Sequence, residues 1–140
     1  MAIPAVAVKE AWKREEPLSL QYLETVGFQS GSVASEFFAT CEGPFSSSRT
    51  GFLLLNAGDP TSTECVEYST AVARSKFSWP EHYLVISDLL AGSVLVYDAA
   101  TDAVYTVDFE GGDSLLIQGT LAPDFPTFLS FLQWYFAGEC

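Results

Sequence analysis

Hydrophobic residues near the C-terminal end of the chain recur with the period of a helix. They fall at i, i+3, i+4, i+7 and i+8, the strongest such signature in the sequence. This spacing predicts a final helix with one buried face, followed by Gly138 just past its end. The residues of that face are Phe128, Phe131, Leu132, Tyr135 and Phe136.

Three shorter patterns predict helices in the first half. Leu18, Tyr22, Leu23 and Val26 form a stripe that Gly27 can end. A second helix follows Ser32 as N-cap, with Glu36 near the capping-box position, and precedes the break at Gly43-Pro44. A third starts at Asp59-Pro60 and runs to about Lys76. The expected buried residues are Val33, Phe37 and Phe38 in the second helix, and Cys65, Tyr68, Val72 and Ala73 in the third.

Short runs rich in β-branched and aromatic residues predict the strands. Residues 83–86, 94–97 and 104–107 form three such runs, and residues 98–102 join the last two as a hairpin loop. Residues 52–55 are wholly apolar, which is typical of a buried strand. Helices and strands do not alternate regularly, so the order favours an α+β fold. We expect a central antiparallel, or mixed, sheet packed by N-terminal, middle and C-terminal helices.

The length and composition fit one folded domain. The chain has 140 residues, of which 49% are hydrophobic and 17% charged, and this balance argues against disorder. We expect a single domain over residues 1–140, with residues 1–17 a flexible or helical N-terminal extension. The N-terminal residues lack the basic start of a signal peptide, and no apolar run reaches 18 residues. A cytoplasmic location is therefore expected.

The charge is strongly negative and unevenly placed. The formal net charge is -12, and all 6 Lys and Arg residues lie within the first 76 positions. An acidic surface repels nucleic acids and anionic membranes, which makes both improbable partners. A protein with a basic surface would be attracted instead. The alternative is that the acidity only keeps an apolar-rich chain soluble.

Cysteine and histidine offer little chemistry. Cys41, Cys65 and Cys140 do not have the spacing of a metal site, and His82 is the only histidine. No phosphate-binding loop, nucleophile elbow or zinc-protease motif occurs. We therefore expect no cofactor and no metal. The remaining enzymatic alternative is a small hydrolase that uses Cys41 or His82.

The acids of the second half lie near predicted strand ends and turns. We expect them to gather at one rim of the sheet, with aromatic residues as anchors for a basic partner. Ordinary solvated turns are the main alternative, and a calcium or acid–base site is a further one. The expected partner-binding residues are Tyr97, Asp98, Asp102, Tyr105, Asp108, Glu110 and Asp113, with Phe109 nearby.

Several motifs resemble a known family. Residues 96–98 read Val-Tyr-Asp, residues 103–105 read Ala-Val-Tyr, and residues 127–132 read Thr-Phe-Leu-Ser-Phe-Leu. Together with Phe37-Phe38 and the turn at residues 42–45, they are similar to the SUKH superfamily, which includes the SMI/KNR-like bacterial immunity proteins. The resemblance covers most of residues 18–136. The chain departs from the family pattern at residues 31–34 and at Glu42-Gly43-Pro44, where an Asn-Gly-Gly turn is common.

The resemblance implies a non-enzymatic protein. Members of this superfamily are most often immunity proteins that bind and neutralise a cognate toxin in bacterial competition. A toxin that attacks nucleic acid has a basic cleft, which an acidic surface could fill. The alternative is a scaffold or adaptor with the same fold and no link to a toxin.

Overall fold

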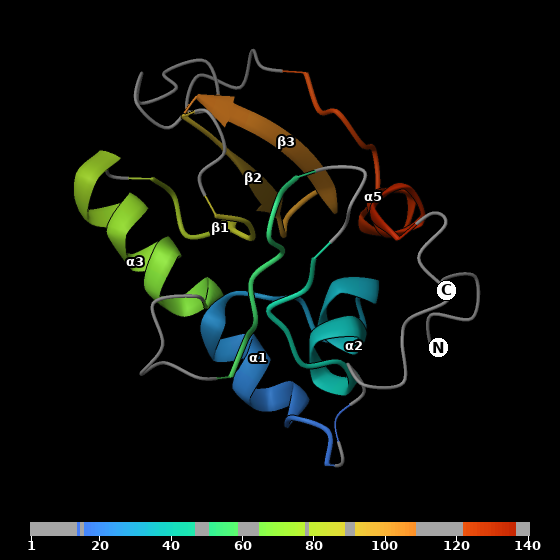
Figure 1. Ribbon diagram of the computed structural model, residues 1–140. Helices are drawn as coiled ribbons and strands as arrows, with labels where there is room; N and C mark the ends of the chain where they lie inside the picture. The colour runs from blue at the N-terminus through green and yellow to red at the C-terminus, as the bar shows by residue number, and fades with distance from the viewer. Residues whose placement is uncertain are drawn as a thin grey trace.

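The computed structural model describes residues 14, 16–46, 51–58, 65–77, 79–88, 92–108 and 122–136. Within these ranges it has four helices and one three-stranded sheet (Figure 1). In chain order the elements are α1 (Leu20–Val26), α2 (Val33–Thr40), α3 (Val66–Phe77), β1 (Tyr83–Val85), β2 (Ser93–Asp98), β3 (Ala103–Asp108) and α5 (Phe128–Tyr135). The predicted α+β class is confirmed.

The sheet is antiparallel, with strand order β1-β2-β3. Asp98 at the end of β2 lies opposite Tyr83 on one side and Ala103 on the other. Single bridges extend the sheet at both edges, since Leu54 pairs with Ser87 and Val104 pairs with Phe125. Residues 52–55, predicted as a strand, therefore join the sheet only through isolated pairing and form no regular strand.

Helices cover the sheet from both sides. In Figure 1, α3 lies beside β1, and α5 lies beside β3 with α2 next to it. Side chains alternate between the faces along a strand, yet the neighbours Val96 and Tyr97 on β2 are both fully buried. Both faces of the sheet are therefore packed.

Aromatic rings from α2 and α5 fill the core. The Phe37 ring centre lies 5.0 Å from that of Phe38 and 5.9 Å from that of Phe128. Tyr97 of β2 reaches the same cluster, with its ring centre 5.2 Å from that of Phe128. The predicted buried face of the final helix is confirmed, and Thr127 caps the helix by accepting a hydrogen bond from the Ser130 backbone N–H (3.1 Å).

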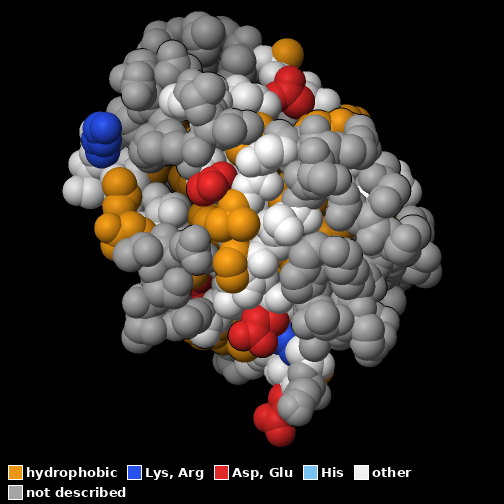
Figure 2. Space-filling model, in the orientation of Figure 1, with side chains coloured by type: hydrophobic (Ala, Val, Ile, Leu, Met, Phe, Trp, Pro, Cys, Tyr) orange, Lys and Arg blue, Asp and Glu red, His pale blue; other side chains and the backbone are white. Residues whose placement is uncertain are grey.

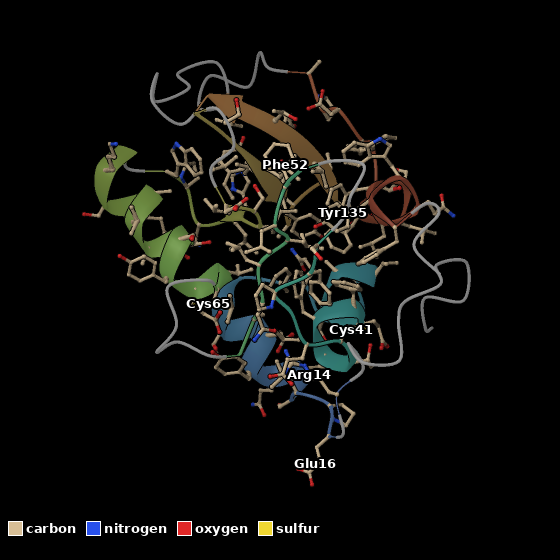
Figure 3. The ribbon with its side chains drawn as sticks, viewed as in Figure 1. Arg14, Glu16, Cys41, Phe52, Cys65 and Tyr135 are labelled. Carbon is tan, nitrogen blue, oxygen red and sulfur yellow. The ribbon has the colours of Figure 1, made fainter. Side chains whose placement is uncertain are left out.

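Tyr135 fastens α5 to the edge of the sheet (Figure 3). Its buried hydroxyl accepts a hydrogen bond from the Leu54 backbone N–H (3.2 Å). The same oxygen lies 2.6 Å from the carbonyl oxygen of Phe52 and 3.0 Å from that of Phe45, to either of which it can donate. The phenol thus links α5 to two loop segments, whose Leu54 N–H and Phe45 carbonyl also bond to each other (2.9 Å).

The third helix differs from the prediction in its start and in its buried face. The helix begins at Val66, because Cys65 pairs with Asn56 and the Val66 N–H donates to the Asn56 carbonyl (2.8 Å). The predicted start at Asp59-Pro60 lies outside the described residues. Tyr68 and Val72, expected in the core, are 47% and 37% exposed. Cys65 and Ala73 are buried as predicted, and Val66 and Thr70 take the places expected for Tyr68 and Val72 in the core.

The described part of the N-terminal segment is tied to the domain. Arg14 and Glu16 are not helical, and the Arg14 N–H donates to the Thr40 carbonyl (2.9 Å). The Arg14 side chain donates to the Phe38 carbonyl (3.1 Å), Asn56 Oδ1 (3.1 Å) and the Ala57 carbonyl (2.6 Å). Residue 14 is therefore part of the fold and does not belong to a free extension.

Candidate functional site

The predicted acidic residues that the structure describes do not all lie along one rim. Asp98 and Asp102 flank the hairpin at one end of β2 and β3, whereas Asp108 lies opposite Ser93 at the other end. Asp108 lies six positions along the chain from Asp102, a distance of about 20 Å in an extended strand. Glu110, Asp113 and Phe109 lie outside the described residues, as does the side chain of Asp108. The expected single rim is wrong for Asp98, Asp102 and Asp108, because the antiparallel register places them at opposite ends.

Two of the predicted contact residues are buried. Tyr97 is 0% exposed, and its hydroxyl donates to Asp102 Oδ1 (2.7 Å). Burial, followed by this hydrogen bond, raises the pKa of Tyr97. Asp98 is 4% exposed, and its Oδ1 accepts from the Ala100 N–H (2.9 Å). Both side chains are too buried to contact a partner, and their hydrogen bonds to Asp102 and Ala100 stabilise the hairpin instead.

Asp102 and Tyr105 are the described members of the predicted set with partly exposed side chains. Asp102 has φ 69°, a left-handed conformation that aspartate tolerates better than most residues. Its second carboxylate oxygen accepts from the Phe128 N–H at 3.3 Å. Burial raises the pKa of Tyr105, and the charge of Asp98 adds to this shift. These two residues remain candidates for contact with a partner.

A polar cleft of about 350 Å³ lies beside the same end of the hairpin. Its walls come from the end of α1, from α3, from the turn before β1 and from the hairpin loop. The sequence did not reveal it, because these segments are far apart in the chain. The lining residues are Glu24, Thr25, Val26, Gly27, Gln29, Arg74, Glu81, His82 and Ala99.

His82 lines this cleft without a catalytic arrangement. Its side chain is 41% exposed, and its Nε2 lies 3.9 Å from Asp98 Oδ1, beyond hydrogen-bond distance. Thr25 supplies the one hydroxyl among the lining residues, and that hydroxyl donates to the Tyr22 carbonyl (2.5 Å). The cleft therefore does not pair a nucleophile with a base.

The two described thiols belong to the core (Figure 3). Cys41 and Cys65 are 3% and 0% exposed. Burial raises the pKa of Cys65, which keeps the sulfur in its unreactive thiol form. The geometry therefore gives no support to the hydrolase alternative at Cys41. In the described part of the chain, no cluster of three or more His, Cys, Asp or Glu residues is placed to hold a metal ion.

The exposed charges of the described residues are mainly acidic. Arg14 is largely buried, and Arg74 is half-buried and donates to the Glu81 carbonyl (2.7 Å), which leaves Lys76 as the exposed cation of these ranges. Figure 2 shows acidic side chains at separate places on one face and a basic group at the end of α3. The exposed acids are Glu16, Glu24, Glu42, Glu81, Asp88 and Asp124.

These features define a small α+β domain whose described residues expose mainly acidic charges and form a polar cleft beside the β-hairpin. Compared with models of protein families, with curated proteins and with solved structures, the chain has no match. None of the described helices has the length and apolar character needed to cross a membrane.

Proposed function

We propose that this protein is a cytoplasmic immunity protein that binds a cognate bacterial toxin and neutralises it without catalysis. The observation that carries the proposal is the distribution of charge. Six carboxylic side chains of the described residues are exposed, while two of the three described cations are withdrawn into the fold. The resemblance of residues 96–98, 103–105 and 127–132 to the SUKH superfamily supports the same function.

The physical basis is electrostatic complementarity. A toxin that cuts or modifies nucleic acid presents a basic cleft to its substrate, and a protein of net charge -12 is attracted to such a cleft. An acidic domain seated there would exclude the nucleic acid by occupying its place. The described thiols are buried, and His82 has no nucleophile beside it in the cleft. Both observations are consistent with a role in binding.

The proposal expects a toxin gene beside the gene of this protein, and the test mixes the full chain with the product of that gene. We expect a stoichiometric complex by native mass spectrometry and loss of toxin activity on mixing. The association rate should fall steeply between low and high salt, because steering by surface charges is screened. If the linked toxin neither binds the protein nor loses activity in its presence, the proposal fails.

The alternative function is that of a scaffold or adaptor, for which the outer face of α3 offers a contact surface. Tyr68 and Val72 are neighbours at i and i+4 on the outer face of α3, where both are exposed. Exposed apolar side chains of this kind can serve contact with any protein. The two functions differ in one assay, because only an immunity protein should protect cells that express the toxin. If the double variant Tyr68→Ala, Val72→Ala still protects cells that express the toxin, the surface that binds the toxin lies outside this face of α3.

A further inference from the structure

The cleft beside the hairpin has a net negative lining. Glu24 from α1 and Glu81 from the turn before β1 are exposed carboxylates in its wall. The buried carboxylate of Asp98 lies behind the wall, 3.9 Å from the Nε2 of His82. Arg74 is the one cation in the lining, and its guanidinium already donates to the Glu81 carbonyl. The lining therefore carries two carboxylates and one guanidinium, and a third carboxylate lies buried behind it.

The end of α1 adds to this negative potential. Thr25, Val26 and Gly27 form the last turn and the C-cap of the helix and line the cleft. The carbonyl groups at a helix C-terminus carry partial negative charge and attract cations. The Gly27 N–H is directed into the helix, where it bonds to the Leu23 and Glu24 carbonyls, both at 3.1 Å. On this side of the cleft the backbone therefore provides hydrogen-bond acceptors, and the Gly27 N–H is not available as a donor.

We infer that the cleft receives an arginine side chain of the protein partner, an inference that rests on the proposed function. A cleft of about 350 Å³ is at the lower end of the size of ligand pockets and suits one side chain. A guanidinium carries five donors in a rigid plane and can meet two carboxylates at once, which a lysine ammonium does less well. Glu24 and Glu81 provide those two carboxylates. The bound side chain adds a positive charge where the lining has an excess of negative charge.

A titration with a small probe tests the cleft without a toxin. We expect Nα-acetyl-arginine amide to shift the backbone amide signals of Gly27, His82 and Ala99 saturably in two-dimensional NMR spectra. Nα-acetyl-citrulline amide has nearly the same shape without the charge and should leave these signals in place. The double variant Glu24→Gln, Glu81→Gln should bind the arginine probe about threefold to tenfold more weakly, as expected for two solvent-exposed ion pairs.

The matched control is Glu16→Gln, Glu42→Gln, which removes the same charge from exposed positions outside the cleft lining. It should bind the probe like the parent chain. An equal response to citrulline, or an equal loss in the control, would overturn the inference.

An experiment with a toxin distinguishes this inference from the proposed function. If the parent chain binds the toxin and Glu24→Gln, Glu81→Gln binds it equally well, the cleft is not the anchor site. If the parent chain binds no linked toxin, the immunity function fails.

Discussion

The hydroxyl of Tyr97 donates a 2.7 Å hydrogen bond to Oδ1 of Asp102, across the turn that joins β2 to β3. The other oxygen of the same carboxylate accepts from the Phe128 N–H, the first residue of α5. One carboxylate therefore joins a buried strand, a left-handed turn position and the start of a helix. This arrangement accounts for an aspartate at φ 69°, where glycine would be less strained.

We predict that Tyr97→Phe lowers the free energy of unfolding by about 1–2 kcal/mol, because the Asp102 carboxylate loses a partly buried donor. Urea unfolding at neutral pH measures this loss. Tyr68→Phe is the control, since that ring is 47% exposed and water can replace the contacts of its hydroxyl. Equal unfolding midpoints for parent and Tyr97→Phe would show that the hydrogen bond contributes nothing to stability.

Arg14 carries the second prediction. Its guanidinium donates to two backbone carbonyls and to Asn56 Oδ1, and its side chain is 9% exposed. Arg14→Met keeps much of the length but removes the guanidinium donor from the two carbonyls, while Asn56 Oδ1 still accepts from the Gly43 N–H, so we expect a loss of about 2–4 kcal/mol. Thermal and urea unfolding of the full chain measure it. The exposed Lys76→Met is the comparison and should change stability little; an Arg14→Met chain as stable as the parent would contradict the anchoring role.

Elements with a strong hydrophobic period could be predicted from the sequence. The face of α5 and the aromatic face of α2 were found because large apolar residues recur every three or four positions and are buried in the structure. The three strands were found because their β-branched residues form compact runs. In these segments the local pattern and the tertiary packing agree.

The buried face of α3 could not be predicted in the same way. Tyr68 and Val72 have helical spacing and are apolar, yet the helix turns Thr70 toward β1. The Thr70 hydroxyl oxygen accepts from the Val85 N–H (3.0 Å), which satisfies a backbone donor at the edge of the sheet. The partner strand, rather than the hydrophobicity of α3, decides which face is buried.

The candidate site was beyond the reach of local patterns for a related reason. The sequence pattern correctly predicts that Asp98 and Asp102 lie near a turn. It does not show that the length of β3 places Asp108 at the opposite end of the sheet. The cleft combines Glu24, Arg74 and His82 from segments that only the tertiary fold brings together. Arg14 reaches Asn56 across 42 positions of sequence, and no local pattern encodes such a contact.

Two glycines provide the third prediction. Gly27 has φ 132°, and a Cβ there would lie 3.0 Å from Leu84 Cδ2, whereas Gly31 has φ 84° and open space around it. Gly27→Ala combines backbone strain with overpacking and should cost about 2–4 kcal/mol. Gly31→Ala carries the strain alone and should cost about 1 kcal/mol. Urea unfolding of both variants measures the difference; equal losses would mean that contact with Leu84 is relieved without cost.

Tyr22 provides a prediction for alkaline pH. Its hydroxyl donates to Glu67 Oε2 (2.5 Å), and burial, then the hydrogen bond and the charge of Glu67, raises the pKa of Tyr22 from 10.0 to about 12. Between these two values the unfolded chain loses a proton that the folded chain keeps. The unfolding free energy should therefore fall as pH rises from 10 to 12, and the contribution is fully present below pH 10.

Tyr22→Phe isolates this group from the other tyrosines. Burial also raises the pKa of Tyr83, Tyr97 and Tyr105, and their contributions to the alkaline loss of stability remain in the variant. Urea unfolding measured at intervals from pH 9 to 12 should give a shallower decline for Tyr22→Phe than for the parent. The difference between the two ultraviolet phenolate titrations should have its midpoint near pH 12, provided that both chains remain folded there. A midpoint near pH 10 in folded protein would mean that the Tyr22–Glu67 hydrogen bond does not favour the neutral phenol.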